Sequence, residues 1–214
     1  TGTLVTTGST LNISAATTLN TSGMTWNNVT LSGTSQTFTL SSNLNLTGTL
    51  TLSGTTTMTL TGSIINTAGL TVTTTATVSG TTAFNFNGTG TWSHTSAGYI
   101  QNNITVNTAG TLTIGTNVYY QTGTLTYTTG TVTTTSSTLN LLNVPTLATG
   151  TVNWNNVVLT ISATLAVALS SNFNVTGTLT LASTAATSTL SFTGAGTLNP
   201  TGALTINNSY ASSG

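Results

Sequence analysis

The chain consists of variants of one short phrase, Leu44-Asn45-Leu46-Thr47-Gly48-Thr49-Leu50-Thr51-Leu52-Ser53-Gly54. Apolar and polar residues alternate on both sides of the Thr-Gly pair, which is the pattern of two short β-strands joined by a tight turn. Alternation places the four leucines on one side of the chain and Asn45 and Thr51 on the other. Neither strand is long enough to be stable alone, so the phrase predicts that copies of it stack on one another.

Apolar residues of this kind form three columns, whose members recur regularly along the chain. The first column contains Met24/Trp26, Leu44/Leu46, Ile64, Phe84/Phe86, Ile104/Val106 and Leu125/Tyr127. The second contains Val29/Leu31, Leu50/Leu52, Leu70/Val72, Trp92, Leu112/Ile114 and Val132. The third contains Phe38/Leu40, Met58/Leu60, Ala76/Val78, Tyr99/Ile100, Val118/Tyr120 and Leu139/Leu141. A repeat of about 20 residues with three strands is typical of a β-solenoid.

The corners between the strands keep the same period. Pairs such as Thr47-Gly48 and Asn87-Gly88 follow the first column, and Gly and Asn both tolerate the positive φ of a sharp turn. Stacked Asn side chains are expected to hydrogen-bond from rung to rung. We therefore predict an all-β fold, a single parallel β-solenoid over residues 1–214 with three short strands per rung. The alternative is a β-sandwich repeat in a filament, whose strands recur less evenly.

A longer repeat is superimposed on the short one. Trp26-Asn27-Asn28-Val29 returns as Trp154-Asn155-Asn156-Val157, and Ser41-Ser42-Asn43 returns as Ser170-Ser171-Asn172. This predicts one copy over residues 1–128 and an incomplete copy over residues 129–214. We count six rungs per copy, one of them lengthened by a protruding loop near residues 142–151 that contains Pro145.

The 214 residues include no Lys, Arg, Asp or Glu, whereas a typical soluble domain has roughly 25% charged residues. Without basic residues no surface can neutralise phosphates, so no nucleic-acid partner is expected. Without carboxylates the acid pair of glycosidases and acidic calcium loops are excluded. Cys is also absent, which excludes disulfides and thiolate metal sites. No apolar run approaches the roughly 18 residues of a membrane span.

His94 is the only side chain expected to titrate near neutral pH. A nucleophile–base pair needs an orienting carboxylate, and a metal site needs further ligands, and the sequence supplies neither. We therefore interpret His94 as a surface or corner residue. The sequence predicts no enzyme activity, no catalytic or metal-binding residue and no cofactor.

Aromatic residues and threonines suggest two possible binding surfaces. Trp26, Trp92 and Trp154 could stack on sugars, although the column positions of Trp26 and Trp154 favour core packing. Tyr99, Tyr119, Tyr120 and Tyr127 lie in neighbouring rungs and would mark an exposed patch or a lateral contact. Outward threonines form a predicted file, as on ice-binding solenoids, although Thr is also the ordinary outward residue of a charge-free strand. The file consists of Thr30, Thr51, Thr71, Ser93, Thr113 and Thr133.

The Thr-, Gly- and Asn-rich rungs resemble the parallel β-helix repeats of bacterial surface adhesins, namely filamentous-haemagglutinin-like and autotransporter passenger proteins. The resemblance covers the whole chain at the level of pattern and transfers no functional residue. It implies secretion, an extracellular or cell-surface location, and a role in adhesion or matrix.

We expect a structural, non-catalytic filament or adhesin segment. Its expected partner is a further copy of itself, end to end, in a longer array or in lateral bundles, with glycans or surfaces as possible additional targets. The absence of charge lets rungs stack without repulsion and removes the usual guards against edge-to-edge association. The alternatives are an ice-binding or carbohydrate-binding module and a viral tail fibre.

Overall fold

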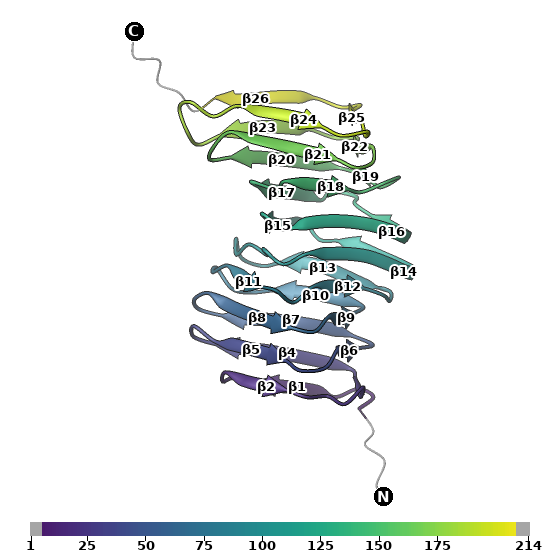
Figure 1. The fold of residues 1–214 in the computed structure, drawn as a ribbon. Helices are drawn as coiled ribbons and strands as arrows, with labels where there is room; N and C mark the ends of the chain where they lie inside the picture. The colour runs from purple at the N-terminus through teal and green to yellow at the C-terminus, as the bar shows by residue number, and fades with distance from the viewer. Residues whose placement is uncertain (1–5, 209–214) are drawn as a thin grey trace, which may run out of the picture.

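The computed structural model describes residues 6–208, which wind into a parallel β-solenoid of about nine turns (Figure 1). A turn contains about 21 residues, and the described residues include no helix. Strands of successive turns pair in parallel, as between Leu50 and Leu70. The predicted fold class is confirmed. The sandwich alternative is wrong, because sandwich strands pair antiparallel.

The solenoid has three faces, which we number by the predicted columns. Face 1 consists of β3 (Thr25–Trp26), β6 (Leu44–Leu46), β9 (Ile65–Thr67), β12 (Phe84–Phe86), the first parts of β14 (Ile104–Ile114) and β16 (Thr124–Thr133), β18 (Thr146–Ala148), β21 (Leu165–Leu169) and β24 (Leu190–Thr193). Face 2 consists of β1 (Thr10–Ile13), β4 (Asn28–Gly33), β7 (Thr49–Gly54), β10 (Gly69–Val72), β13 (Gly90–His94) and the second parts of β14 and β16. In chain order, face 2 continues with the separate sheet of β19 (Asn153–Trp154), β22 (Phe173–Val175) and β25 (Leu198–Pro200).

Face 3 begins with β2 (Thr17–Leu19), β5 (Thr37–Leu40), β8 (Met58–Gly62) and β11 (Val78–Gly80). Isolated bridges from Val78 to Ile100 and from Ile100 to Tyr120 carry it across one turn. It continues with β15 (Asn117–Gln121), β17 (Thr138–Leu142), β20 (Asn156–Ile161), β23 (Leu179–Ser183) and β26 (Leu204–Asn208). The prediction of three short strands per rung has two exceptions. At β14 and β16 one strand runs continuously from face 1 to face 2, and in the turn of Ile100 face 3 has only isolated bridges.

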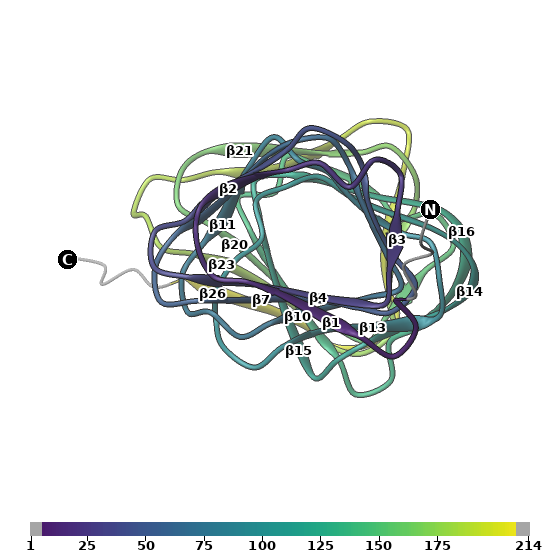
Figure 2. The same cartoon turned by 90° about the horizontal axis from the view of Figure 1, so that it is seen from below.

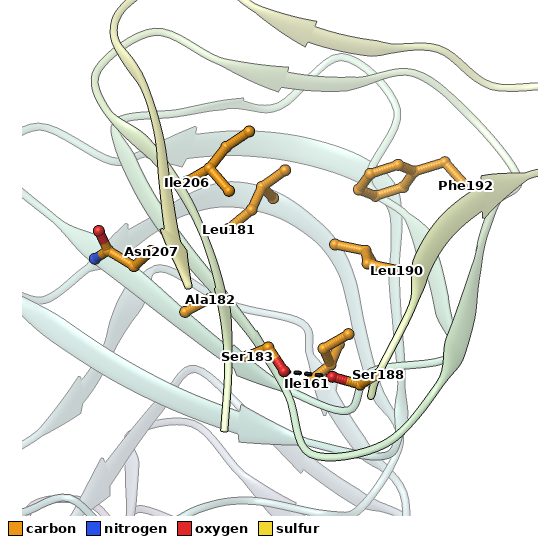
Figure 3. A pocket seen from close by; sticks show the side chains of 9 residues that line it. All are labelled: Ile161, Leu181, Ala182, Ser183, Ser188, Leu190, Phe192, Ile206 and Asn207. Atoms are coloured by element: carbon orange, nitrogen blue, oxygen red, sulfur yellow. Dashed lines mark hydrogen bonds between the residues drawn. The ribbon is translucent and has the colours of Figure 1, made fainter. Parts of the chain in front are cut away.

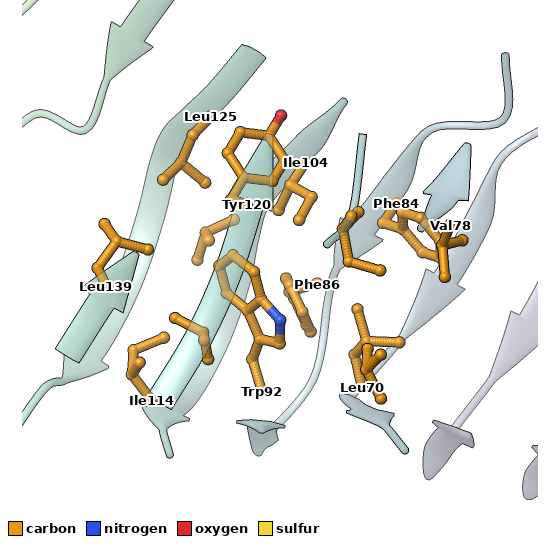
Figure 4. Close-up of a cluster of buried hydrophobic side chains, with 14 of the residues drawn as sticks. Leu70, Val78, Phe84, Phe86, Trp92, Ile104, Ile114, Tyr120, Leu125 and Leu139 are labelled. Atoms are coloured by element: carbon orange, nitrogen blue, oxygen red, sulfur yellow. The ribbon is translucent and has the colours of Figure 1, made fainter. Parts of the chain in front are cut away.

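A single apolar core fills the space between the faces. In the middle turns each face contributes an aromatic ring, Phe86 from β12, Trp92 from β13 and Tyr120 from β15 (Figure 4). Phe86 and Trp92 have ring centroids 5.8 Å apart, and Trp92 meets Tyr120 edge-on at 6.3 Å. Most inward side chains are fully shielded from solvent, so burial against the turns above and below supplies the main stabilisation.

Two inward positions of the predicted first column are wrong. Leu44 pairs with Ile65, not with Ile64, and the Ile64 side chain is 43% exposed. Met24 is also exposed, because a turn precedes β3 and only Trp26 reaches the core. A shift by a single position reverses the side of a strand to which a side chain points, and adjacent isoleucines give the sequence no means to choose between them.

Asparagine side chains bond from turn to turn along the outside of face 1. The Nδ2 of Asn66 donates to the Oδ1 of Asn45 at 2.8 Å, and the Nδ2 of Asn85 donates to the Oδ1 of Asn66 at 2.9 Å. On face 2, Asn199 and Asn174 repeat this bond at 3.0 Å. The predicted asparagine stacking is present, but Asn45 and Asn85 belong to strand centres and not to corners.

The predicted loop near residues 142–151 is wrong. Residues 146–148 form β18, which pairs with β16 and β21, and Leu147 is fully buried. Pro145 precedes the strand, and its carbonyl accepts a hydrogen bond from the Ala168 N–H. The equivalent segment one long repeat earlier is the strand β2. Both segments are therefore ordinary strands with few apolar residues.

Residues related by the longer repeat make matching contacts. Thr10 pairs with Asn28, and Thr138 pairs with Asn156. Yet β1 and β4 belong to face 2, whereas β17 and β20 belong to face 3. Along face 3 the chain takes six turns from β5 to β20, through β8, β11, Ile100, β15 and β17. Since β4 directly precedes β5, one long repeat makes six turns and one additional face. The bounds 1–128 and 129–214 stay a prediction, and residues 1–5 and 209–214 lie outside the described residues.

The additional face offsets the twist of the sheets. Adjacent parallel strands rotate by roughly 20°, so six turns amount to about 120°, which is one face of a three-faced solenoid. In the view along the axis, β21 lies on the same side as β2, and β26 lies on the same side as β7 (Figure 2). By sequence, β21 is the counterpart of β5, which pairs with β2. The counterpart of β7 is β23, and β26 pairs with β23. Equivalent strands of the two copies therefore lie on the same side of the rod in this view.

We predict that Gly80→Ala lowers thermal stability strongly, by about 2–4 kcal/mol. Gly80 has φ +114°, and a Cβ there would lie 2.0 Å from the carbonyl oxygen of Leu60 in the turn below. Gly23→Ala is the control, because Gly23 also has a positive φ, +78°, but open space around it. Its expected cost is about 1 kcal/mol. Equal shifts in the melting temperatures of the two variants, measured by circular dichroism, would contradict the close contact between turns.

Candidate functional site

His94 ends β13 at the start of the wide corner, and its ring is largely shielded from solvent. The Nε1–H of Trp92 donates to His94 Nε2 at 3.0 Å, and His94 Nδ1 lies 2.9 Å from the carbonyl oxygen of Gly98. Because the indole only donates and the carbonyl only accepts, the ring is held as the neutral Nδ1–H tautomer. Burial lowers the pKa of His94 to about 4, and the hydrogen bond to Gly98 acts in the opposite direction. Both nitrogens are thus occupied in a structural contact.

The three tryptophans lie in the core or against it. Trp92 and Trp154 are buried, and Trp26 is partly buried and packs against the core. The buried Nε1–H groups of Trp26 and Trp154 have no hydrogen-bond partner. These rings are therefore not available as an external platform for sugars, as the column positions of Trp26 and Trp154 predicted.

The four tyrosines that the sequence groups together separate in the structure. Tyr120 points into the core, and Tyr127 is partly buried, with its hydroxyl donating to the Gly130 carbonyl at 2.6 Å. Tyr99 and Tyr119 are partly buried on the outside of face 3, edge to face with ring centroids 5.5 Å apart. Only this pair forms a patch.

The predicted threonine file on face 2 is interrupted. Thr30 and Thr51 are in register, and so are Thr71 and Ser93. In the next turn Thr113 pairs with Thr91, not with Ser93. The predicted file therefore holds from Thr30 to Ser93, but a shift of register between β13 and β14 displaces Thr113 and Thr133 from it.

The C-terminal end of the described solenoid exposes its core. Leu204 and Ile206, which pair with Leu179 and Leu181 of the turn below, are 53% and 70% exposed. A pocket of about 190 Å³ opens there (Figure 3). It is lined by Ile161, Leu181, Ala182, Ser183, Ser188, Leu190, Phe192, Ile206 and Asn207.

This pocket exists because the last turn is wide. Leu165 pairs with Leu190, whereas Leu50 pairs with Leu70, so the chain takes a longer path around the last turn than around the earlier one. The added residues form a corner at 184–189. Ser183 and Ser188 are hydrogen-bonded to each other across this corner (Figure 3). Leu190 and Phe192 do not fill the larger cross-section, so apolar groups of a further layer have a place to insert.

Both ends of the described solenoid present edge strands. β1, β2 and β3 each pair with a strand on one side, as do β24, β25 and β26 at the other end. At the first end Leu11, Ile13 and Leu19 are only partly buried. Edges of this kind are templates for pairing with another chain. The two ends of the described solenoid are therefore candidate surfaces for pairing with a further layer of the same kind.

A second cleft lies on the side of the rod. Most of its lining residues are polar, and they are Thr25, Asn45, Leu46, Thr47, Ala68, Asn87 and Gly88. No helix among residues 6–208 has the length and apolar character needed to cross a membrane.

Comparisons with protein-family models, with curated proteins and with solved structures each found no match. The class of this molecule therefore rests on its own geometry, that of a charge-free parallel β-solenoid.

We predict that the protein loses stability as the pH falls from about 6.5 to about 4, and that His94→Gln removes this loss. His94 has a lowered pKa in the folded state, so the unfolded chain binds the proton more tightly, and the stability that is present above pH 6.5 declines toward pH 4. The expected loss is about 2–3 kcal/mol. No Asp or Glu side chain titrates in this range. Melting temperatures of both proteins across this pH range test the effect, and a parallel decline in the variant would contradict it.

Proposed function

We propose that this chain is a non-catalytic structural rod of an extracellular filament or cell-surface adhesin, which associates with further copies of itself through its ends. The observation that carries the proposal is the continuous stack from β1 to β26, with one apolar core that is open beside Leu204 and Ile206. An exposed apolar surface next to three edge strands favours a partner that continues the same stack.

The absence of charge supports stacking of identical layers. Strands of adjacent turns lie about 4.8 Å apart, and like side chains fall on one another, as Thr51 does on Thr71. Two like charges about 4 Å apart repel by about 1 kcal/mol in bulk water and by more near a protein surface. A chain without charges avoids this cost at every layer, inside one molecule and between molecules.

An extracellular position fits the same composition. Trypsin-like proteases cut after Lys or Arg, and the chain offers neither. The resemblance to adhesin β-helix repeats points in the same direction. Antibodies against the chain are expected to label intact cells of the source organism, and labelling only after permeabilisation would contradict this location.

We predict that Leu204→Lys combined with Ile206→Lys strongly weakens axial association. Stacking would bury two unpaired ammonium groups, which is costly. The unmodified chain is expected to form rods that lengthen with concentration, and the variant is expected to weaken association at least tenfold, about 1.4 kcal/mol. Sedimentation velocity measures the strength of association, and negative-stain electron microscopy measures the length of the rods.

The matched control is Thr91→Lys combined with Thr128→Lys, which adds the same charge at two exposed positions on the side of the rod. It should leave axial association within about threefold of the unmodified chain, whereas lateral bundling would decrease. A monodisperse monomer of the unmodified chain at every concentration would contradict the proposal, and so would equal loss of association in both variants.

A further inference from the structure

One patch on the outside of face 3 differs in composition from the rest of the rod. It consists of Tyr99, Gln101, Tyr119, Gln121 and Asn140, which we call the tyrosine–glutamine patch. The bridge from Ile100 to Tyr120 sets Tyr99 beside Tyr119 and Gln101 beside Gln121, and Tyr119 pairs with Asn140. Two of the three glutamines of the chain and two of its five tyrosines thus meet on two adjacent turns, and Asn140 lies on the next.

The rings of this patch are held in fixed positions. Tyr119 lies between two rings, edge to face with Tyr99 at 5.5 Å and tilted against His94 at 5.7 Å. His94 is itself fixed by its bonds to Trp92 and Gly98. A ring that is already ordered loses little conformational entropy when a ligand stacks on it.

The polar groups of the patch are available to a ligand. The side-chain amides of Gln101 and Gln121 make no hydrogen bond to any other described residue, and each offers donors and an acceptor. Asn140 uses its Nδ2 for the Val118 carbonyl at 3.2 Å. All three residues are partly exposed to solvent.

We propose that the tyrosine–glutamine patch is a docking surface for a neutral carbohydrate. A sugar ring combines an apolar C–H face, which stacks on a tyrosine ring, with hydroxyl groups, which exchange hydrogen bonds with amides. The whole rod is uncharged, so nothing in it compensates the charge of an acidic or basic ligand. The two rings stand at 77° to each other, and the flanking amides offer hydrogen bonds to the hydroxyl groups of a short oligosaccharide.

This inference is independent of the proposed end-to-end association, since the patch lies on the side of the rod. The Leu204→Lys/Ile206→Lys variant is expected to bind carbohydrate as the unmodified chain does. Loss of carbohydrate binding would therefore leave the proposed end-to-end association intact. Loss of that association would likewise leave the carbohydrate proposal intact.

The test uses the complete chain on an array of neutral, sialylated and sulfated oligosaccharides, followed by calorimetry with the neutral hexose oligomers that bind. We expect binding to one neutral class, weakened about tenfold or more by Tyr119→Ala. Gln101→Ala combined with Gln121→Ala is expected to weaken it about fivefold, the value of about one hydrogen bond.

Two further variants separate loss of contact from loss of folding. Tyr119→Phe keeps the ring and should stay within about threefold of the unmodified chain, and Thr91→Ala, on face 2, should have no effect. Melting temperatures confirm that each variant is folded. The proposal is overturned if no neutral oligosaccharide binds at millimolar concentration, if only charged glycans bind, or if a folded Tyr119→Ala binds normally.

Discussion

The parallel stacking of each turn on the one before it is the constraint on which this molecule depends. A backbone ladder between turns requires that strands of successive turns align, and a buried core requires that an inward side chain always falls on another inward side chain. Leu50, Leu70 and Trp92 satisfy both conditions on face 2. This constraint also favours small residues where the chain bends, because glycines such as Gly80 lie against the backbone of the turn below.

The same constraint accounts for the unusual surface. Stacking brings identical side chains together at each layer, so charged residues are penalised, while Asn and Thr gain bonds along the axis. The Asn45–Asn66–Asn85 ladder is one such series. The Trp-Asn-Asn corner is another, because Asn28 Oδ1 accepts from the Thr49 N–H and Asn156 Oδ1 accepts from the Thr178 N–H, both at 2.8 Å.

The proposed roles use different parts of the rod. The open ends offer apolar surface and edge strands, which suit a partner built in the same way. The tyrosine–glutamine patch offers rigid rings and amides on the side, which suit a neutral carbohydrate. Because equivalent strands of the longer repeat lie on the same side, a rod extended by this repeat would present its surface features in one line.

The sequence by itself determined the all-β solenoid, the short period of its turns, the three columns of inward residues and the absence of charge, because each of these is a local or periodic property. The tertiary structure alone decided which of Ile64 and Ile65 faces inward and that residues 146–148 form a strand. It also decided that the longer repeat includes one additional face, that His94 bonds to Trp92 and Gly98, and that Tyr99 and Tyr119 stay outside while Tyr120 is buried. These features depend on the register and twist of stacked turns, and those arise from contacts between residues that lie a full turn apart in the chain.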